Sequence, residues 1–204
     1  MPVPVIYLAS RSPRRQDLLL QLGVDFIALS LREAPGRDSD VHETPRAGEP
    51  AADYVKRIAR TKASVGWHRM QQRGLAPMPV LGADTEVVLD GAIFGKPADT
   101  ADALRMLSLL SGRTHEVLTA IGLRWERQIV LAVSVSAVTM RELAPDEVER
   151  YVASGEPVDK AGGYAVQGRA AAFIRRIEGS YSGVMGLPLF ETAEALAHIG
   201  FPVL

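Results

Sequence analysis

The sequence predicts an α/β protein organised around a mixed β-sheet. Roughly six or seven apolar, β-branched segments alternate with about five segments of helical periodicity, a pattern typical of α/β folds. The strands expected at 116–124 and 128–141 follow one another directly and predict a hairpin, so the sheet is not purely parallel. With 204 residues and 47% hydrophobic content, the chain (residues 1–204) is expected to form one folding unit with a substantial core.

The balance of charge limits the partners that the protein can attract. The formal net charge is -1, from 23 basic and 24 acidic residues, so no bulk field favours nucleic acid or an anionic membrane. The chain has no Cys, which excludes disulfides, thiolate catalysis and Cys-based zinc sites. The N-terminal apolar run ends at Arg11, too short for a signal peptide, and the stretch 129–140 is far shorter than the roughly 20 residues that span a bilayer. We therefore expect a cytoplasmic protein that does not contact membranes and binds any phosphate locally.

A first strand, expected at 3–9, leads directly into the run Ser10-Arg11-Ser12-Pro13-Arg14-Arg15. Ser12 suits an N-cap and Pro13 suits a first helical position, and the helix that follows should precede a second strand at 24–30. Free backbone N–H groups, a positive helix end, hydroxyls and arginines would meet at this turn, which is one way to build a phosphate site. A solvated basic face beside an ordinary cap explains the same pattern.

A long polar connection at 31–50 carries Glu43, and its length is typical of a functional or partly disordered loop. Nothing in the local pattern distinguishes Glu43 from a solvated loop acid. The next helix is expected at 50–70, with Lys62 on its apolar stripe. A lysine there either extends to solvent along the helix, which we favour, or points its ammonium into a cleft shared with other groups.

The stretch 80–91 reads as a buried strand that ends in an Asp-Gly turn, yet it contains Asp84. An ionised carboxylate is costly there unless a cation pairs with it, and otherwise the acid takes a proton. Lys96, held between Gly95 and Pro97, is the nearest candidate for the positive partner. A structural ion pair and an active-site acid explain this pattern equally well.

The remaining regular elements follow from capping residues and periodicity. Helices are expected over 99–110 and 145–153, a last strand over 173–177, and a terminal helix over 189–199 after a glycine-rich turn. His115 lies at the entry of the first hairpin strand. We interpret it as a hydrogen-bonded strand-end residue rather than a metal ligand.

A second unusual segment, 156–168, combines three glycines with Asp159, Lys160 and Gln167. The glycines allow the backbone to approach a ligand closely, and the Gln167 amide could read a base edge by both donating and accepting hydrogen bonds. The alternative is a structured surface loop in which Asp159 pairs with Lys160.

Eight short motifs occur in order along nearly the whole chain. They are Leu8-Ala9-Ser10-Arg11-Ser12-Pro13-Arg14-Arg15, Tyr54-Val55-Lys56-Arg57-Ile58-Ala59 with Lys62-Ala63, Gly82-Ala83-Asp84-Thr85, Gly95-Lys96-Pro97, Leu110-Ser111-Gly112-Arg113-Thr114-His115 with Val117, Asp159-Lys160-Ala161-Gly162, Gln167-Gly168 and Gly186-Leu187-Pro188. Each motif alone is weak. In this order and at these spacings, the chain resembles the Maf family of nucleoside triphosphate pyrophosphatases.

The resemblance implies a fold like that of the inosine triphosphatase superfamily, an elongated mixed sheet with flanking helices in two lobes around a central cleft. It also implies hydrolysis between the α- and β-phosphates of a nucleoside triphosphate, with a divalent cation, Mg²⁺ or Mn²⁺, as cofactor. By position, Asp84 looks like the base that activates water, Asp84 and Glu43 like metal contacts, and Lys62 and Lys96 like further members of the catalytic set. The substrate contacts implied are Ser10, Arg14, Arg15, Thr85, Asp159, Lys160 and Gln167.

Within the family, the branch that acts on dTTP and UTP has arginine, threonine and glutamine where this chain has Arg14, Thr85 and Gln167. The branch that acts on 7-methyl-GTP differs at these places. The resemblance therefore implies dTTP and UTP as substrates, with modified pyrimidine nucleotides as further candidates.

This sequence departs from the family pattern before the Lys62 helix. The family usually has an Asp-Glu pair there, whereas the aligned residues here are His42 and Glu43. The preceding segment, 31–40, also looks longer than usual. The surroundings of Glu43 and the metal geometry are thus less well defined than the rest of the site.

Two other functions stay open. Maf proteins are also linked to arrest of septum formation, so a nucleotide- or nucleic-acid-binding regulator without turnover is the main rival, although the balanced charge argues against a nucleic-acid binder. The same chemistry directed at 7-methyl-GTP or other modified nucleotides is the second. A homodimer is compatible with the sequence, which does not fix the oligomeric state.

Overall fold

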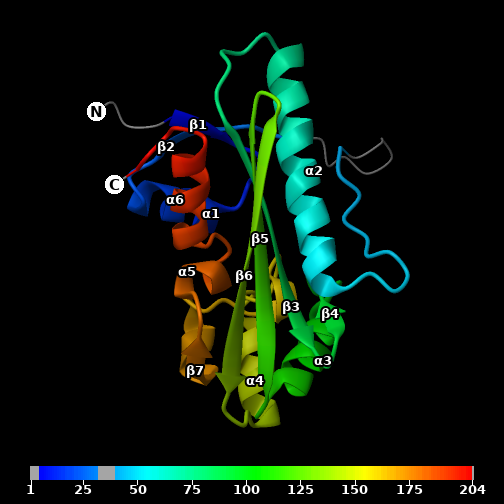
Figure 1. The fold of residues 1–204 in the computed structure, drawn as a ribbon. Helices are drawn as coiled ribbons and strands as arrows, with labels where there is room; N and C mark the ends of the chain where they lie inside the picture. The colour runs from blue at the N-terminus through cyan, green and yellow to red at the C-terminus, as the bar shows by residue number, and fades with distance from the viewer. Residues whose placement is uncertain (1–4, 32–39, 204) are drawn as a thin grey trace.

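The computed structural model describes residues 5–31 and 40–203 and shows an elongated mixed sheet flanked by helices (Figure 1). The strands are β1 Val5–Leu8, β2 Asp25–Ala28, β3 Val80–Leu89, β4 Ala92–Phe94, β5 Thr114–Trp125, β6 Gln128–Met140 and β7 Ile174–Glu178. The helices are α1 Pro13–Gln21, α2 Ala51–Gln72, α3 Thr100–Leu110, α4 Pro145–Ala153, α5 Tyr181–Met185 and α6 Leu189–His198, with short 3₁₀ turns at Ala161–Gly163 and Arg169–Phe173.

The sheet has seven strands in the order β2-β1-β3-β5-β6-β7, with β4 paired to the end of β3. β1 is parallel to β2 and β3, whereas the pairs β3–β5, β5–β6 and β6–β7 are antiparallel. The long β5–β6 hairpin confirms the expected pairing, and its length gives the molecule its elongated form (Figure 1). The predicted mixed α/β class is therefore correct.

Helix α2 lies directly on one face of the sheet, along β3 and β5 (Figure 1). Two glycines permit this close packing. A Cβ atom at Gly82 would lie 2.6 Å from the backbone nitrogen of Ala63, and one at Gly122 would lie 2.8 Å from the carbonyl oxygen of Ala59. Since any larger side chain would push the helix away, these glycines fix the height of α2 above the strands.

The opposite face carries two separate apolar clusters, one near each end of β3 and β5. At one end α1 and α6 pack against Leu81 and Ile121. At the other end α3 and α4 pack against Val87 and Val117. The two clusters leave the middle of β3 for other contacts.

Some elements differ from the sequence-based expectation. The glycine-rich turn before the last helix contains α5, because Ser180 caps it by accepting a hydrogen bond from the Gly183 nitrogen at 2.9 Å. In β6 the serines face inward: Ser136 is buried and accepts a hydrogen bond from the Ser180 nitrogen at 2.9 Å, while Val135 is 51% exposed. The polar face of β6 is thus buried because it binds the backbone before α5. Residues 3 and 4 of the first expected strand lie outside the described residues.

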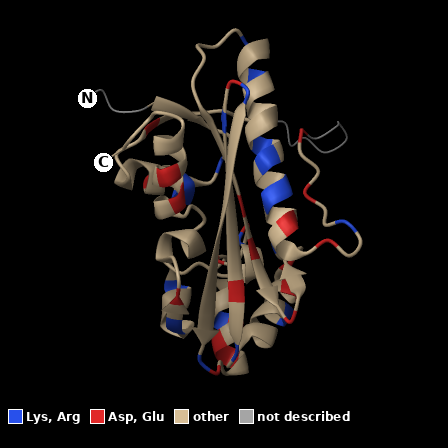
Figure 2. Ribbon diagram, viewed as in Figure 1, with Lys and Arg blue, Asp and Glu red and all other residues tan. Residues whose placement is uncertain are grey.

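Charged residues are distributed over the surface without a single-sign face in the view of Figure 2. Helix α2 is mostly basic, with a single acid in its first turn, whereas residues of both signs occur on the helices at the two ends of the sheet (Figure 2). No helix among the described residues is both long and apolar enough to cross a bilayer. The balanced charge of the whole sequence, with 23 basic and 24 acidic residues, argues against a nucleic-acid binder.

His115 is buried in β5, and its Nε2 atom shares a 2.7 Å hydrogen bond with the Tyr164 hydroxyl. This contact confirms the interpretation of His115 as a hydrogen-bonded strand residue. Burial lowers the pKa of His115 to about 4, because the charged imidazolium is poorly solvated there.

We predict that His115 makes the protein less stable in mild acid. In the unfolded chain His115 takes up a proton near its ordinary pKa of 6.5, whereas in the folded chain it stays neutral until about pH 4. The contribution of His115 is therefore complete above about pH 6.5 and is lost, by up to about 3 kcal/mol, as the pH falls toward 4. Urea unfolding at pH 7.5 and pH 5 measures the effect. His115→Gln should show a smaller loss between the two, and an equal loss in both proteins contradicts the assignment.

Candidate active site

The candidate site opens along an unpaired part of the β3 edge. β1 pairs with β3 only as far as Leu81, and β4 pairs with β3 from Val87 onward. Between these points, 82–86 pair with β5 on one edge, and no strand in the described part of the chain pairs with them on the other. A cavity of about 1030 Å³ adjoins this gap, so side chains from both faces of β3 reach it.

All the residues that the sequence singled out line this one cavity. They come from the turn after β1, the first turn of α1, the connection before α2, α2 itself, β3, the turn after β4 and the segment after α4. The lining set includes Ser10, Arg14, Arg15, Glu43, Lys62, Asp84, Thr85, Lys96, Asp159, Lys160 and Gln167. The fold thus gathers residues that are scattered between positions 10 and 167 of the sequence.

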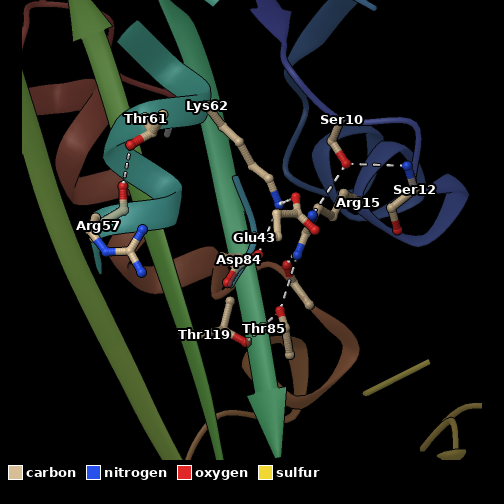
Figure 3. Close-up of polar contacts among 11 residues, drawn as sticks. Ser10, Ser12, Arg15, Glu43, Arg57, Thr61, Lys62, Asp84, Thr85 and Thr119 are labelled. Carbon is tan, nitrogen blue, oxygen red and sulfur yellow. Dashed lines mark hydrogen bonds and ion pairs between the residues drawn. The ribbon is translucent and has the colours of Figure 1, made fainter. Parts of the chain in front are cut away.

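The centre of the site is an ammonium shared by two carboxylates. Lys62 Nζ donates to Asp84 Oδ1 at 2.8 Å and lies 2.7 Å from Glu43 Oε1 (Figure 3). The Lys62 side chain is only 13% exposed, so the prediction that it extends to solvent is wrong. A single cation therefore connects helix α2, strand β3 and the connection before α2.

The predicted pairing of Asp84 with Lys96 is also wrong, because the structure pairs Asp84 with Lys62. The reason is the glycine contact under α2: a Cβ atom at Gly82 would lie 2.8 Å from Lys62 Cβ. The lysine therefore starts directly above Gly82 and runs along the strand to Asp84, two residues further on the same face. Lys96 lines the cavity instead of closing this pair.

The electrostatics of the two paired acids differ. Burial raises the pKa of Asp84, and the nearby Lys62 and Arg15 only partly offset this effect. For Glu43 burial also acts upward, but Lys62 outweighs it and the net pKa is lowered. Asp84 is thus the acid with the greater affinity for a proton, and one of its oxygens, Oδ2, is buried without a hydrogen-bond partner among the described residues.

The sequence analysis did not single out Glu86, which lies beside Asp84 in the cavity. Its Oε2 atom is buried and, within the described chain, has no hydrogen-bond partner. Burial, followed by the charge of Asp84, raises the pKa of Glu86 to about 8. The available signal was strand alternation, since residues 84 and 86 of a strand point to the same face.

Arg15 holds the turn after β1 against β3 and α5. Its Nη1 atom donates to Ser10 Oγ at 3.2 Å, Nη2 to Thr85 Oγ1 at 3.1 Å, and Nε to the Gly186 carbonyl at 2.7 Å (Figure 3). Ser10 Oγ also accepts from the backbone nitrogen of Ser12 at 3.2 Å. Ser12 itself occupies the N-cap position of α1, but within the described chain its side chain makes no capping bond.

A second group of polar side chains lines the same cavity. Burial lowers the pKa of the Arg14 guanidinium, and the nearby Asp159 carboxylate opposes this shift. Lys160 donates to the Val158 carbonyl at 3.2 Å, and no ion pair described for this chain joins it to Asp159. Gln167 also lines the cavity, so an arginine, a lysine and an amide share it with the acids of β3.

The carboxylates suit a hard divalent cation in part. In the described part of the chain, no group of three or more His, Cys, Asp or Glu side chains is arranged to hold a metal ion. Asp84 and Glu86 nevertheless each present one buried, unpartnered oxygen among the described residues, and oxygen is the donor that Mg²⁺ and Mn²⁺ prefer. Mg²⁺ commonly takes only one or two carboxylates and completes its shell with water and phosphate oxygens, so the donor set fits.

Comparison with known proteins gives a consistent family match. The family described as Maf-like protein matches residues 5–199. The dTTP/UTP pyrophosphatase of Nitrosomonas europaea is 56% identical over 97% of this chain and 96% of its own length. The dTTP/UTP pyrophosphatase of Nitrosospira multiformis is 58% identical over 94% of this chain and 92% of its own length.

A comparison of structures also found the Staphylococcus aureus Ham1 protein. It is 16% identical in sequence, with a TM-score of 0.46 over 83% of this chain and 90% of its own.

We predict that Arg15→Lys weakens the fold around the site. Lysine cannot reproduce three directed hydrogen bonds from one planar group, so we expect a loss of about 1–3 kcal/mol in the free energy of unfolding. Urea denaturation measures this loss. Arg14→Lys, the neighbouring change on the same helix, is the matched control and should cost less. Equal effects of the two changes would show that the Arg15 network does not stabilise the turn.

Proposed function

Because the chain belongs to the Maf family, we propose that it hydrolyses nucleoside triphosphates, dTTP and UTP foremost, to the monophosphate and pyrophosphate. The observation that carries this proposal is the Asp84–Lys62–Glu43 bridge, placed in a cavity whose other walls carry arginines and lysines. The dTTP/UTP pyrophosphatases of other bacteria, at 56% and 58% identity over nearly full length, support it.

The cations of the cavity provide a binding site for the polyphosphate. Arg14, Lys96 and Lys160 surround the space, and Arg15 uses three of its five donor hydrogens within the protein. The free donors can meet phosphate oxygens, where charge-assisted hydrogen bonds are strong. Fixed cations of this kind also stabilise the charge that develops on the pyrophosphate leaving group.

Asp84 is our candidate for the general base. One oxygen is fixed by Lys62, and Oδ2 is buried without a partner among the described residues, so it can accept a proton from a water molecule. The water oxygen forms a bond to phosphorus, the bridging oxygen between the α- and β-phosphates leaves with pyrophosphate, and the proton passes to Asp84. A raised pKa makes Asp84 a better acceptor than an ordinary aspartate, because a stronger base takes the proton more readily.

A divalent cation, Mg²⁺ or Mn²⁺, belongs to the proposal. Asp84 and Glu43 are the ligands that family resemblance implies, and the unpartnered oxygen of Asp84 supports the first of them. A carboxylate oxygen has two lone-pair sites, so Oδ2 could ligate the ion with one and accept from the water with the other. When bound, the ion would neutralise phosphate charge and polarise the phosphoryl oxygens. Lys62 holds the carboxylates of Asp84 and Glu43 near one another and thereby prepares their arrangement.

The base-recognition assignment rests on position. Thr85 lies on the opposite face of β3 from Asp84, where its hydroxyl accepts from Arg15 and shares a 2.9 Å hydrogen bond with Thr119. Gln167 lines the same cavity. We propose that Arg14, Thr85 and Gln167 select dTTP and UTP, with modified pyrimidine nucleotides as possible further substrates of the same pocket.

We predict that Asp84→Asn lowers turnover at least a thousandfold while nucleotide binding persists. The amide keeps the shape of the side chain but cannot take up a proton, and general-base catalysis contributes roughly 10² to 10⁴ in rate, to which any loss of metal binding adds. Pyrophosphate release from dTTP measures turnover, and calorimetric titration with dTTP measures binding. Turnover within tenfold of the wild type would remove Asp84 from the role of base.

We predict that the wild-type protein, with Mg²⁺ or Mn²⁺, converts dTTP and UTP to monophosphate and pyrophosphate and acts more slowly on CTP and 7-methyl-GTP. Phosphorus NMR distinguishes these products from a diphosphate plus phosphate. No turnover of any nucleotide with either metal would favour the binding regulator over the enzyme.

We predict that Lys96→Ala raises the KM for dTTP about tenfold or more, because one phosphate contact is lost. Steady-state kinetics of pyrophosphate release measures the change, and an unchanged KM would contradict the assignment.

A further inference from the structure

The middle of β3 carries a second acid, the half-buried Glu86, on the same face as Asp84. Residues two apart in a strand lie about 7 Å from one another along it, and a glutamate side chain is long enough to reach back toward its neighbour. Both side chains line the cavity. Each has one oxygen that is buried and lacks a hydrogen-bond partner among the described residues, and Asp84 as a whole is only 6% exposed.

No hydrogen bond to Glu86 Oε2 is made within the described chain, although the charges of Lys62 and Lys96 partly offset the effect of burial on this acid. Across the sheet, Asp84 faces Ala120 and Glu86 faces Leu118, both of which belong to the apolar cluster under α2. On the open edge, Gly95 has no side chain, and a Cβ atom built there would still lie 3.9 Å from Glu86 Oε2. Glu86 thus lines the cavity with a carboxylate oxygen that has no hydrogen-bond partner in the described chain.

The nearest ammonium is already occupied. Lys62 Nζ is held between Asp84 Oδ1 and Glu43 Oε1, at 2.8 Å and 2.7 Å. Two buried carboxylates on one face of a strand repel one another, and burial of each charge is costly unless a cation compensates it. A small divalent cation with oxygen preference would satisfy both free oxygens at once.

We propose that Glu86 is a ligand of the divalent cation, together with Asp84, so that the metal lies against β3 rather than between Asp84 and Glu43 alone. The inference deepens the proposed function and rests on it for the identity of the remaining ligands, which would be phosphate oxygens and water. Glu43, with its Oε1 atom engaged by Lys62 and its side chain 45% exposed, then serves mainly to hold that lysine.

Mn²⁺ binding tests the proposal without relying on turnover. Titration of the full-length protein with Mn²⁺ alone, followed by electron paramagnetic resonance of the free ion, gives the affinity. The titration is repeated with the α,β-methylene analogue of dTTP, which contains no cleavable bond at this position. We expect Glu86→Gln, which keeps the shape and removes the charge, to bind Mn²⁺ at least tenfold more weakly in both titrations.

The matched control is Glu116→Gln, an exposed acid on the same sheet face in β5, which should bind Mn²⁺ like the wild type. Glu86→Asp keeps the charge and should recover part of the affinity, and it replaces Glu86→Gln if the latter does not fold. Equal Mn²⁺ affinity in the wild type and the folded Glu86 variants, or no binding by the wild type in either titration, would overturn the proposal.

Turnover of dTTP by the wild type, measured in parallel, separates this inference from the proposed function. Turnover by the wild type together with unchanged Mn²⁺ affinity in Glu86→Gln refutes the ligand assignment and leaves the function intact. Weaker Mn²⁺ binding in the variant without any turnover by the wild type supports the ligand assignment and refutes the proposed substrate.

Discussion

The ammonium of Lys62, shared between Glu43 and Asp84, is the contact on which the organisation of the site depends. It is made by a helix, a strand and a connecting segment at one point, with 2.8 Å and 2.7 Å to the two acids. Neither carboxylate would be well compensated without it, because burial disfavours the charge on both. The pair is possible only because Gly82 lets α2 approach the strand, so a packing detail in the core determines the electrostatics of the cavity.

Strand β3 serves two purposes along its length. Its ends are buried between α2 and the apolar clusters of the opposite face, whereas its middle, at 84–86, lies at the gap between β1 and β4. A strand edge without a partner normally exposes backbone groups that invite further pairing. Here the surrounding turns cover the edge and convert it into a cavity wall, so alternate side chains from both faces reach the same space.

Much of the fold could be predicted from local patterns, because capping residues, turns and periodicity act within a few residues. The hairpin and the helix at Pro145–Ala153 are examples. The contacts of the site could not be predicted in the same way. Lys62 and Lys96 lie on either side of Asp84 in the sequence, and only the packing of α2 on Gly82 decides between them. Strand alternation places Glu86 on the same face as Asp84, but the sequence does not show whether its carboxylate has a partner. Glu86 could therefore be identified as a site residue only from the structure.

The cavity combines unsatisfied acids with an excess of directed cations, and this combination has a physical consequence. Asp84 and Glu86 bear raised pKa values because burial disfavours their charge, so the protein alone holds them at an electrostatic cost. A polyphosphate alone would add negative charge beside them and increase that cost. Under the proposed function, a polyphosphate that arrives with a divalent cation would relieve it, because the ion would compensate the acids while Arg14, Lys96 and Lys160 would meet the phosphates. The burial that raises the electrostatic cost of these acids would therefore favour the metal-bound nucleotide over the free nucleotide. Charged side chains in an apolar strand reduce the stability of the fold, and such exceptions are expected at functional sites.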